Sequence, residues 1–471
     1  MKVLFTSAEA VPFVKTGGLG DVMGTLPRAL VKKGVECDVV LPLFGSIGEE
    51  YRSRLSRLTS FCCTLDGQSY NCTVHTLALN GVRFFFVENN DLFGGSVYGG
   101  DEALKFSFFC RAVLEALPHI GIPDIIHAND WHTGMILLLL EEQYRHIPAY
   151  RNIKTVFMIH NLRYQGLFPI DRIKRLLYLP NSCFTFDKIE YYGNASFMKA
   201  GIVYCHKILT VSPTYAGEIQ TPCYGEGLDG LLRYRQSSLS GILNGVSYES
   251  FDPATDPALP LHYSADEPEG KAACKATLQA QLGLGASNDT PIIGMVSRLT
   301  QQKGFSLIEE AFDELMKRSV QLAIIGQGDG HWEWFFHAMQ QKYPERIGFR
   351  AEYSDSVSRL IYAGSDMFLM PSLFEPCGIS QMIAMKYGTL PIVRETGGLK
   401  DTVVPYNKFT GEGTGFSFAE AASSDMLNAI DRAIACYNDK NAWQRLMRQA
   451  MECDFSWNSS TDKYIELYRE L

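Results

Sequence analysis

The sequence predicts two doubly wound α/β domains in tandem. The first observation is length, because 471 residues exceed what one ordinary hydrophobic core supports and indicate about two large domains. The second is an alternation of short apolar runs with segments of helical spacing, the pattern of a sheet covered by helices. The third is a break in this alternation after residue 247, followed by its return near residue 291.

The first half of the chain contains apolar runs that we read as strands. Several are apolar throughout, which is typical of strands that are buried on both faces of a parallel sheet. Between them, LPRALVKKG and ALKFSFFCRAVLEAL have the spacing of helices. We therefore expect a parallel sheet with strands at residues 2–8, 37–42, 82–89, 124–130, 155–161 and 207–212.

The break in the alternation is rich in Pro, Asp, Gly and Ala, and contains one short helical segment, GKAACKATLQAQLG. Beyond it, further strands are expected at residues 291–300, 322–328, 346–352, 366–372 and 389–395. The final segment, FSWNSSTDKYIELYREL, is an amphipathic helix that can pack on either domain. We assign residues 1–245 and 456–471 to a first Rossmann-like domain, and residues 246–455, with a linker at 246–290, to a second.

Composition and charge exclude several classes of protein. A hydrophobic content of 46% with 20% charged residues is typical of a soluble globular protein. The net charge of −9 argues against a nucleic-acid partner, because no basic excess is present to neutralise phosphates. The 12 cysteines are scattered and form no C-x-x-C pair, which favours reduced thiols. The opening MKVLFTSAEAVPF is no signal peptide, and no apolar window is long enough for a membrane span, so we expect a cytoplasmic protein without a membrane partner.

The stretch KTGGLGDV follows the first predicted strand and resembles a phosphate-binding loop without matching either common type. Gly18 and Gly20 fit the first half of a dinucleotide motif, but Met23 stands where its third glycine belongs. A P-loop has its lysine after the glycines, whereas Lys15 precedes them. Glycine amides at a helix start, with Lys15 before them and Asp21 after, suit an anion. A tight connection between strand and helix explains the loop equally well.

Polar side chains follow the fourth and fifth predicted strands, in HANDWHTG and MIHNLRYQG. Ligands of open α/β sheets bind beyond the carboxyl ends of strands, so two facing domains are expected to place such residues on a shared cleft. Neutral donors and acceptors suit sugar hydroxyls, and the spacing of His127 and His132 fits no zinc-binding helix, so no metal is expected. For any single histidine, a buried and satisfied imidazole remains the alternative. The polar residues are His127, Asp130, His132, His160 and Asn161.

The second half has two comparable clusters. Arg298 and Lys303 are five residues apart across a turn and can converge on one phosphate, unless they are ordinary surface cations. In PSLFEPCGISQ, Glu375 lies between two apolar residues just before a predicted helix, which favours a partly desolvated, functional carboxylate. A second GG pair, in RETGGLKDTV, again suits contact with phosphate or carboxylate.

Taken together, these motifs closely resemble those of bacterial glycogen synthases and their starch synthase relatives. The resemblance rests on KTGGLGDV, HANDWHTG, IHNLRYQG, YGEGLDGLLR, ILNGV, SRLTQQKG, PSLFEPCGISQ and RETGGLKDTV, which occur in this order over essentially the whole chain. It implies a GT-B fold with donor and growing α-1,4-glucan between two domains. It also implies a retaining transfer of glucose from a nucleotide sugar, most simply ADP-glucose, with no required metal or other cofactor; UDP-glucose is the alternative donor.

The resemblance also implies roles for individual residues. The nucleotide of the donor mostly contacts the second domain, and its diphosphate is held by Arg298 and Lys303. The implied catalytic residues are Glu375, Arg298, Lys303, His160 and Asp130. The implied donor-binding residues are Lys15, Gly18, Asp21, Asn161, Asn244, Tyr353, Cys377 and Gly378.

The chain departs from the family pattern at three positions. Ile383 stands where many related retaining transferases have a second glutamate, so we favour same-face attack by the acceptor hydroxyl, with the leaving phosphate taking its proton. Asn129 replaces the first histidine of HDWH, and Glu226 replaces an aromatic residue of YGYGLDG. These two changes are expected to affect acceptor contacts or nucleotide choice.

Four other interpretations compete with this one. A sucrose-synthase-like transferase is the nearest, while a phosphorylase needs a longer chain and a pyridoxal-phosphate lysine. A dinucleotide-dependent oxidoreductase lacks support, because the third glycine and an acidic residue ending the second strand are both absent. A silent glucan-binding protein is disfavoured by Lys15, Arg298, Lys303 and Glu375. The sequence leaves the oligomeric state, monomer or homo-oligomer, undetermined.

Overall fold

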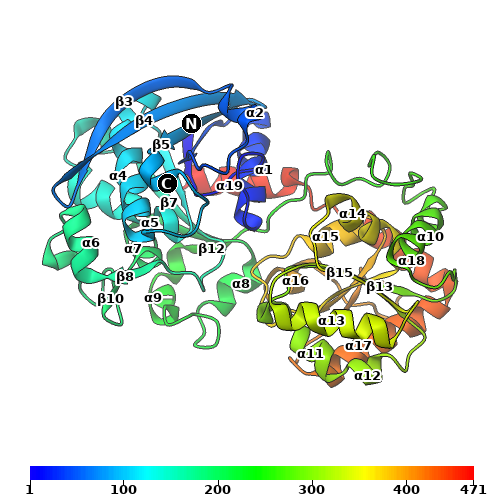
Figure 1. Cartoon of the computed structure of the whole chain (residues 1–471). Helices are drawn as coiled ribbons and strands as arrows, with labels where there is room; N and C mark the ends of the chain where they lie inside the picture. The colour runs from blue at the N-terminus through cyan, green and yellow to red at the C-terminus, as the bar shows by residue number, and fades with distance from the viewer. The chain divides into compact units, whose positions relative to one another are not determined.

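The computed structural model describes residues 1–471, which divide into two compact units (Figure 1). Unit 1 comprises Met1–Val211, Ala216–Gly245 and Trp457–Leu471. Unit 2 comprises Ser212–Tyr215 and Val246–Ser456. No helix of the chain combines the length and apolar character that crossing a bilayer requires.

Unit 1 is built on a nine-stranded sheet of order β12-β11-β7-β6-β1-β2-β5-β4-β3. All neighbours from β12 to β5 pair in parallel, and their largely apolar sequences are buried. The strands are β1 (Lys2–Thr6), β2 (Glu36–Pro42), β3 (Ser56–Leu65), β4 (Gln68–Leu79), β5 (Val82–Glu88), β6 (Ile125–Asn129), β7 (Lys154–Ile159), β11 (Lys207–Thr210) and β12 (Leu239–Gly241). Short strands β8 (Leu167–Pro169), β9 (Glu190–Tyr191) and β10 (Asn194–Ser196) form a separate sheet.

The strands β3 and β4 form a long antiparallel hairpin at the edge of this sheet, which the sequence analysis did not predict (Figure 1). Most of their residues are exposed or partly exposed, so they lack the continuous apolar runs that mark the parallel strands. The signals that mark them are the turns Asp66-Gly67 and Asn80-Gly81. All four of these residues have positive φ, the conformation that tight hairpin turns require.

Helices cover both faces of the large sheet in unit 1. The helix α19 (Trp457–Arg469) lies beside α1 (Gly18–Lys32), where the Lys33 ammonium donates to the Asn458 carbonyl at 2.7 Å (Figure 1). The others are α2 (Glu49–Arg52), α3 (Asn90–Phe93), α4 (Glu102–Ile120), α5 (Trp131–Leu139), α6 (Ile170–Leu177), α7 (Phe197–Tyr204) and α9 (Asp229–Tyr234). The short α8 (Pro213–Glu218) contains residues of both units.

Unit 2 contains an entirely parallel six-stranded sheet of order β15-β14-β13-β16-β17-β18. Its strands are β13 (Ile292–Val296), β14 (Gln321–Ile325), β15 (Ile347–Arg350), β16 (Met367–Met370), β17 (Leu390–Arg394) and β18 (Phe416–Phe418). Its helices are α10 (Gly270–Leu282), α11 (Phe305–Glu310), α12 (Phe312–Leu315), α13 (Gly330–Lys342), α14 (Asp355–Gly364), α15 (Ser380–Lys386), α16 (Gly397–Thr402), α17 (Ser423–Asn438) and α18 (Lys440–Met451). The sequence analysis missed the short edge strand β18.

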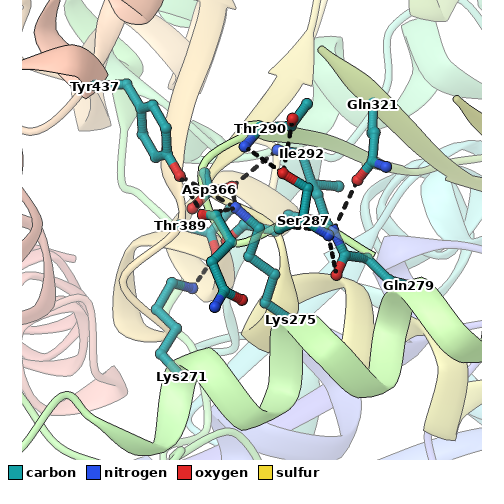
Figure 2. A network of polar contacts seen from close by, with 12 residues as sticks. Lys271, Lys275, Gln279, Ser287, Thr290, Ile292, Gln321, Asp366, Thr389 and Tyr437 are labelled. Atoms are coloured by element: carbon teal, nitrogen blue, oxygen red, sulfur yellow. Dashed lines mark hydrogen bonds and ion pairs between the residues drawn. The ribbon is translucent and has the colours of Figure 1, made fainter. Parts of the chain in front are cut away.

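A buried polar network ties α10 to the amino-terminal edge of this sheet (Figure 2). The Lys275 ammonium donates to the Asp366 carboxylate at 2.9 Å and to the Tyr437 hydroxyl at 3.1 Å. The same carboxylate accepts from the backbone amide of Ile292 at 2.8 Å, at the start of β13. Because Asp366 precedes β16, one ion pair holds the starts of two strands, and the carboxyl-terminal edge is left for functional loops.

Candidate active site residues

The glycine-rich loop after β1 is organised by Glu9, a buried residue that sequence reasoning missed. Its carboxylate accepts hydrogen bonds from the backbone amides of Thr16 at 2.5 Å and Gly17 at 3.0 Å, and from the Thr16 hydroxyl at 2.5 Å. These two amides are therefore occupied by the protein's own carboxylate. Of the glycine amides expected to face an anion, that of Gly17 is thus already bonded, whereas the role of Gly18 stays a prediction. The helix α1 begins at Gly18, where no side chain caps its N-terminus and a Cβ would meet open space.

Lys15 and Asp21 form an ion pair of 2.8 Å at the surface of this loop, with 46% and 39% of their side chains exposed. An ion pair with this exposure contributes only about 0–1 kcal/mol. A phosphate, which carries more charge than one carboxylate, therefore competes readily with Asp21 for the Lys15 ammonium.

Asp130, directly after β6, holds the loop that follows β7. Its Oδ1 accepts from the backbone amide of His160 at 2.7 Å and, more weakly, from that of Asn161 at 3.4 Å. Burial raises the pKa of the Asp130 carboxyl to about 7, and the negative charge of Glu9 adds to the shift. Asp130 has φ 53°, a conformation that costs free energy in any residue with a Cβ and often occurs at functional sites. The structure thus places Asp130, His160 and Asn161 together.

Three histidines near these strand ends have different roles. The Nε2 atom of His160 lies 2.9 Å from Oδ1 of Asn129, and burial lowers the pKa of His160 to about 3, so its imidazole is neutral. His127 stacks on Phe5, while its Nδ1 lies 2.7 Å from the Tyr468 hydroxyl. The third, His132, stacks on Trp131 at 4.1 Å between ring centroids. His127 and His132 are fully buried and belong to the core, so only His160 stands at the site.

Tyr98 is a second residue that sequence reasoning missed. Partial burial raises the pKa of its hydroxyl although 47% of the residue is exposed, and Glu9 and Asp130 add negative charge nearby, while a hydrogen bond with the Thr16 side chain opposes the shift. Its position in the glycine-rich stretch FGGSVYGG is the only sequence signal for it. Tyr98 therefore lies next to the carboxylates that hold the two loops.

In unit 2, Glu375 is nearly buried on the loop after β16 and pairs with Lys303. The Lys303 ammonium lies 2.6 Å from Glu375 Oε2, which also accepts from the Ser372 hydroxyl at 3.0 Å. Lys303 ends a short 3₁₀ helix (Gln301–Lys303) after β13, so residues from neighbouring strands meet at the carboxyl edge of the sheet. Arg298 is exposed and makes no ion pair, whereas Lys303 is held by the Glu375 carboxylate. Their convergence on one phosphate stays a prediction.

The loop that carries Glu375 is packed tightly against α16. A Cβ on Gly397 would lie 1.9 Å from the Glu375 carbonyl oxygen, and one on Gly398 would lie 2.0 Å from that of Cys377. The Gly398 amide donates to the carbonyls of Glu375 and Pro376, both at 3.2 Å. The second GG pair allows this close approach, and the Gly398 amide is occupied. Contact of this segment with an anion stays a prediction.

Gln381 holds the turn formed by Cys377 and Gly378, where Gly378 has φ 72°. Its amide nitrogen lies 3.2 Å from the Cys377 carbonyl and 3.0 Å from that of Gly378. Two further predicted residues belong one to each unit. Asn244 is buried with its Oδ1 unpaired near the end of unit 1, and Tyr353, after β15, is 66% exposed.

Comparison with known proteins identifies the family. The model of the starch synthase catalytic domain matches residues 2–234, and that of glycosyl transferases group 1 matches residues 282–450. A glycogen synthase of Desulforamulus reducens is 46% identical over 474 residues, covering 100% of this chain and 99% of that protein. One of Clostridioides difficile is 47% identical over 478 residues and 100% of both chains. The chain belongs to the glycogen synthase family.

Solved structures agree with this membership. The catalytic domain of starch synthase IV from Arabidopsis thaliana, bound to ADP and acarbose, matches with a TM-score of 0.92 and 34% identity over 99% of this chain and 98% of that one. Sucrose-phosphate synthase from Thermosynechococcus elongatus matches with a TM-score of 0.64 at 18% identity, over 100% and 98% of the two chains, which supports the fold alone. The predicted GT-B class and glycosyltransferase activity are confirmed.

The three departures from the glycogen synthase pattern lie in different surroundings. Ile383 is buried in α15. Glu226 is exposed with φ 48°, and its carbonyl accepts hydrogen bonds from the Gln165 amide at 2.8 Å and the Tyr191 hydroxyl at 2.6 Å. Asn129 is fully buried, so any effect on acceptor contacts or nucleotide choice has to pass through neighbouring residues.

Proposed function

We propose that this protein is a glycogen synthase that transfers glucose from ADP-glucose to the non-reducing end of an α-1,4-glucan, with retention of configuration and release of ADP. Full-length identity of 46–47% with glycogen synthases supports the reaction class. The observation that carries the proposal is the nearly buried Glu375 carboxylate, held by Lys303 at 2.6 Å at the carboxyl edge of the unit 2 sheet. A carboxylate fixed in this way can accept hydrogen bonds from sugar hydroxyls, while the adjacent Lys303 ammonium can bind a phosphate.

The transfer breaks the bond between the anomeric carbon and the diphosphate oxygen, and forms a bond to a hydroxyl oxygen of the glucan. The acceptor hydroxyl attacks from the face that the diphosphate leaves, and its proton passes to the leaving phosphate oxygen. Arg298 and Lys303 stabilise the charge that grows on this phosphate, which lowers the barrier because that charge is largest in the transition state. The buried Ile383 offers no second carboxylate for a covalent intermediate.

The remaining residues bind the donor in this proposal. Lys15, with Asp21 beside it, and the open N-terminus of α1 at Gly18 favour negative charge. The amides of Cys377 and Gly378 and the side chains of His160 and Asn161 contact glucosyl oxygens, while Asp130 holds the backbone of His160 near the reacting sugar. Asn244 and Tyr353 border the nucleotide. The cations perform the task of a metal, so we propose that none is required and that activity persists in EDTA.

A side-by-side donor assay tests the function. Purified protein with glycogen and ADP-glucose is expected to release ADP and to lengthen the glucan, and to consume UDP-glucose more slowly. Consumption of neither donor contradicts the synthase function, and glycogen binding without turnover supports the silent-binder alternative. A preference for UDP-glucose contradicts only the choice of nucleotide.

Single substitutions test the assigned roles. Glu375→Ala and Arg298→Ala are each expected to lower kcat by about 100-fold or more, the usual cost of losing a charge-stabilising group. The control is Arg318→Ala, because Arg318 pairs with Asp431 just before β14, at the amino edge of the sheet. Near-normal kcat in the Glu375 or Arg298 variant, with unchanged melting temperature, contradicts its assigned role.

A further inference from the structure

Asn129 lies at the end of β6 and is fully buried. Both polar atoms of its side-chain amide have partners within the protein. Its Nδ2 donates to two backbone carbonyls, those of Thr6 and His127, both at 3.1 Å. A carbonyl oxygen accepts and never donates, so the atom facing these two groups is the amide nitrogen. The amide oxygen must therefore be the atom that faces His160.

The orientation of this amide decides which nitrogen of His160 carries the proton. Oδ1 of Asn129 lies 2.9 Å from Nε2 of His160, and an amide oxygen only accepts hydrogen bonds. Nε2 of His160 must then be an N–H group. Burial lowers the pKa of His160 to about 3, so the imidazole carries a single proton at neutral pH and Nδ1 carries none. The titratable groups near this ring are His127, a neutral buried imidazole, and Asp130.

Nδ1 of His160 is the part of the ring that remains available to a ligand. It has no hydrogen-bond partner within the protein and is not among the buried unpaired atoms, and His160 is only partly buried. The backbone of His160 is fixed by Asp130 at 2.7 Å, so both the main chain and the ring are held. A bare imidazole nitrogen in a fixed position accepts a hydrogen bond and cannot donate one.

We propose that Asn129 is a positioning residue that holds His160 as the Nε2–H tautomer and thereby presents its unprotonated Nδ1 to a hydroxyl group of the sugar substrate. In this arrangement His160 accepts a hydrogen bond from the sugar and is not a proton donor in the transfer. Histidine, the residue usual in the family at position 129, has only two ring nitrogens and cannot donate twice and accept once. Asparagine satisfies all three contacts at once, which leaves its Oδ1 as a fixed acceptor facing His160. The nature of the ligand rests on the proposed function, whereas the tautomer does not.

The tautomer is tested directly by nitrogen NMR of the full chain labelled with ¹⁵N-histidine, without ligand. The His160 signals are identified by their loss in His160→Gln. We expect one neutral form at pH 7, with the proton on Nε2; a proton on Nδ1, a mixture of tautomers or an imidazolium overturns the proposal. In Asn129→Ala, a population protonated on Nδ1 is expected to appear, and an unchanged spectrum also overturns it. The wild-type measurement decides the tautomer even if this variant does not fold.

The hydroxyl contact is tested with ADP-glucose analogues that each lack one sugar hydroxyl. For each protein, the loss is the ratio of kcat/KM with ADP-glucose to kcat/KM with the analogue. For the analogue that lacks the contacted hydroxyl, this loss is expected to be about tenfold larger in wild type than in Asn129→Ala, which is the effect of one hydrogen bond. Equal losses in both proteins for every analogue overturn this contact.

The matched control is Thr133→Val, because the Thr133 hydroxyl bonds only to backbone groups, including the amide of Asn129 at 2.7 Å. Thr133→Val is expected to lower the melting temperature but to keep both the tautomer and the wild-type loss of kcat/KM with the analogue. If this loss disappears in Thr133→Val, the proposal is overturned. If no donor is consumed, the proposed function fails while the NMR result stands.

Discussion

Glu9 determines which groups of the glycine-rich loop remain available for an anion. Its carboxylate accepts from the amides of Thr16 and Gly17, the groups that a phosphate would meet in a common nucleotide loop. What remains is the Lys15 ammonium and the uncapped start of α1 at Gly18. The loop therefore offers charge and a helix end rather than a ring of amides, which suits contact with one part of a larger ligand.

The buried carboxyl of Asp130 predicts a specific dependence of stability on pH. Its folded pKa of about 7 lies above the ordinary value of 3.8, so the folded state keeps a proton that the unfolded state releases between these values. Asp130 therefore lowers stability progressively as the pH rises from about 4 to about 7. Asn in its place can still accept from the His160 amide but does not titrate. Asp130→Asn is thus expected to raise the melting temperature relative to wild type, by more at pH 8 than at pH 5.

Thermal melts of both proteins from pH 5 to pH 8 measure this difference. A difference in melting temperature that stays constant over this range contradicts the raised pKa.

At the scale of elements, the loop after β16 is placed by contacts that glycine alone permits. Gly304 has φ 74°, and a Cβ there would lie 1.9 Å from the Pro371 carbonyl oxygen. Gly397 and Gly398 allow the equivalent approach of α16 from the other side. The Glu375 carboxylate is thus positioned by backbone packing of three elements, in addition to its own ion pair with Lys303.

Gly398→Ala is expected to displace this loop and to lower kcat/KM by at least about tenfold, although no ligand-binding side chain is changed. The physical reason is the 2.0 Å separation between the new Cβ and the Cys377 carbonyl oxygen, which forces the backbone apart. Gly330→Ala is the matched control in the same unit, because a Cβ there meets nothing within 4 Å. Steady-state kinetics of the two variants measure this effect, and circular dichroism checks that both are folded. Equal kcat/KM in Gly398→Ala and Gly330→Ala would show that the close approach of α16 does not position the Glu375 loop.

The elements that could be predicted from the sequence are those whose burial leaves a pattern. Parallel strands such as β1 and β7 are apolar on both faces and were read from composition alone. The β3–β4 hairpin was missed because most of its residues are exposed or partly exposed, although Asp66-Gly67 marks its turn. At the site, Lys303 and Glu375 were found from their motifs, whereas Glu9 was not, since nothing in SAEAVPF distinguishes a buried carboxylate from a surface one. Pairings between distant residues depend on the fold and leave no local signal.

At the scale of the whole molecule, the two units have separate cores, and the network at the amino edge of unit 2 stabilises only one of them. Lys275 and Asp366 are nearly buried, at 7% and 11% side-chain exposure, and lie 91 residues apart in sequence. The hydrogen bond from the Ile292 amide to the Asp366 carboxylate connects β13 to this ion pair (Figure 2). The pair therefore joins α10, β13 and β16 at the edge of the sheet opposite to the loop that carries Glu375.

Removing one partner of this pair is expected to destabilise unit 2 strongly and selectively. Lys275→Met leaves the Asp366 carboxylate buried without its cation, a change that typically costs about 3–5 kcal/mol. Adding Asp366→Asn removes the charge while keeping an oxygen for the Ile292 amide, so the double variant is expected to recover part of this loss. Hydrogen exchange followed by mass spectrometry measures both units in one experiment. Exchange in β13 and β16 should accelerate in the single variant and slow again in the double variant, while β1 and β6 of unit 1 stay protected. If unit 1 loses protection to the same extent, the two cores unfold as one and this account of their independence is wrong.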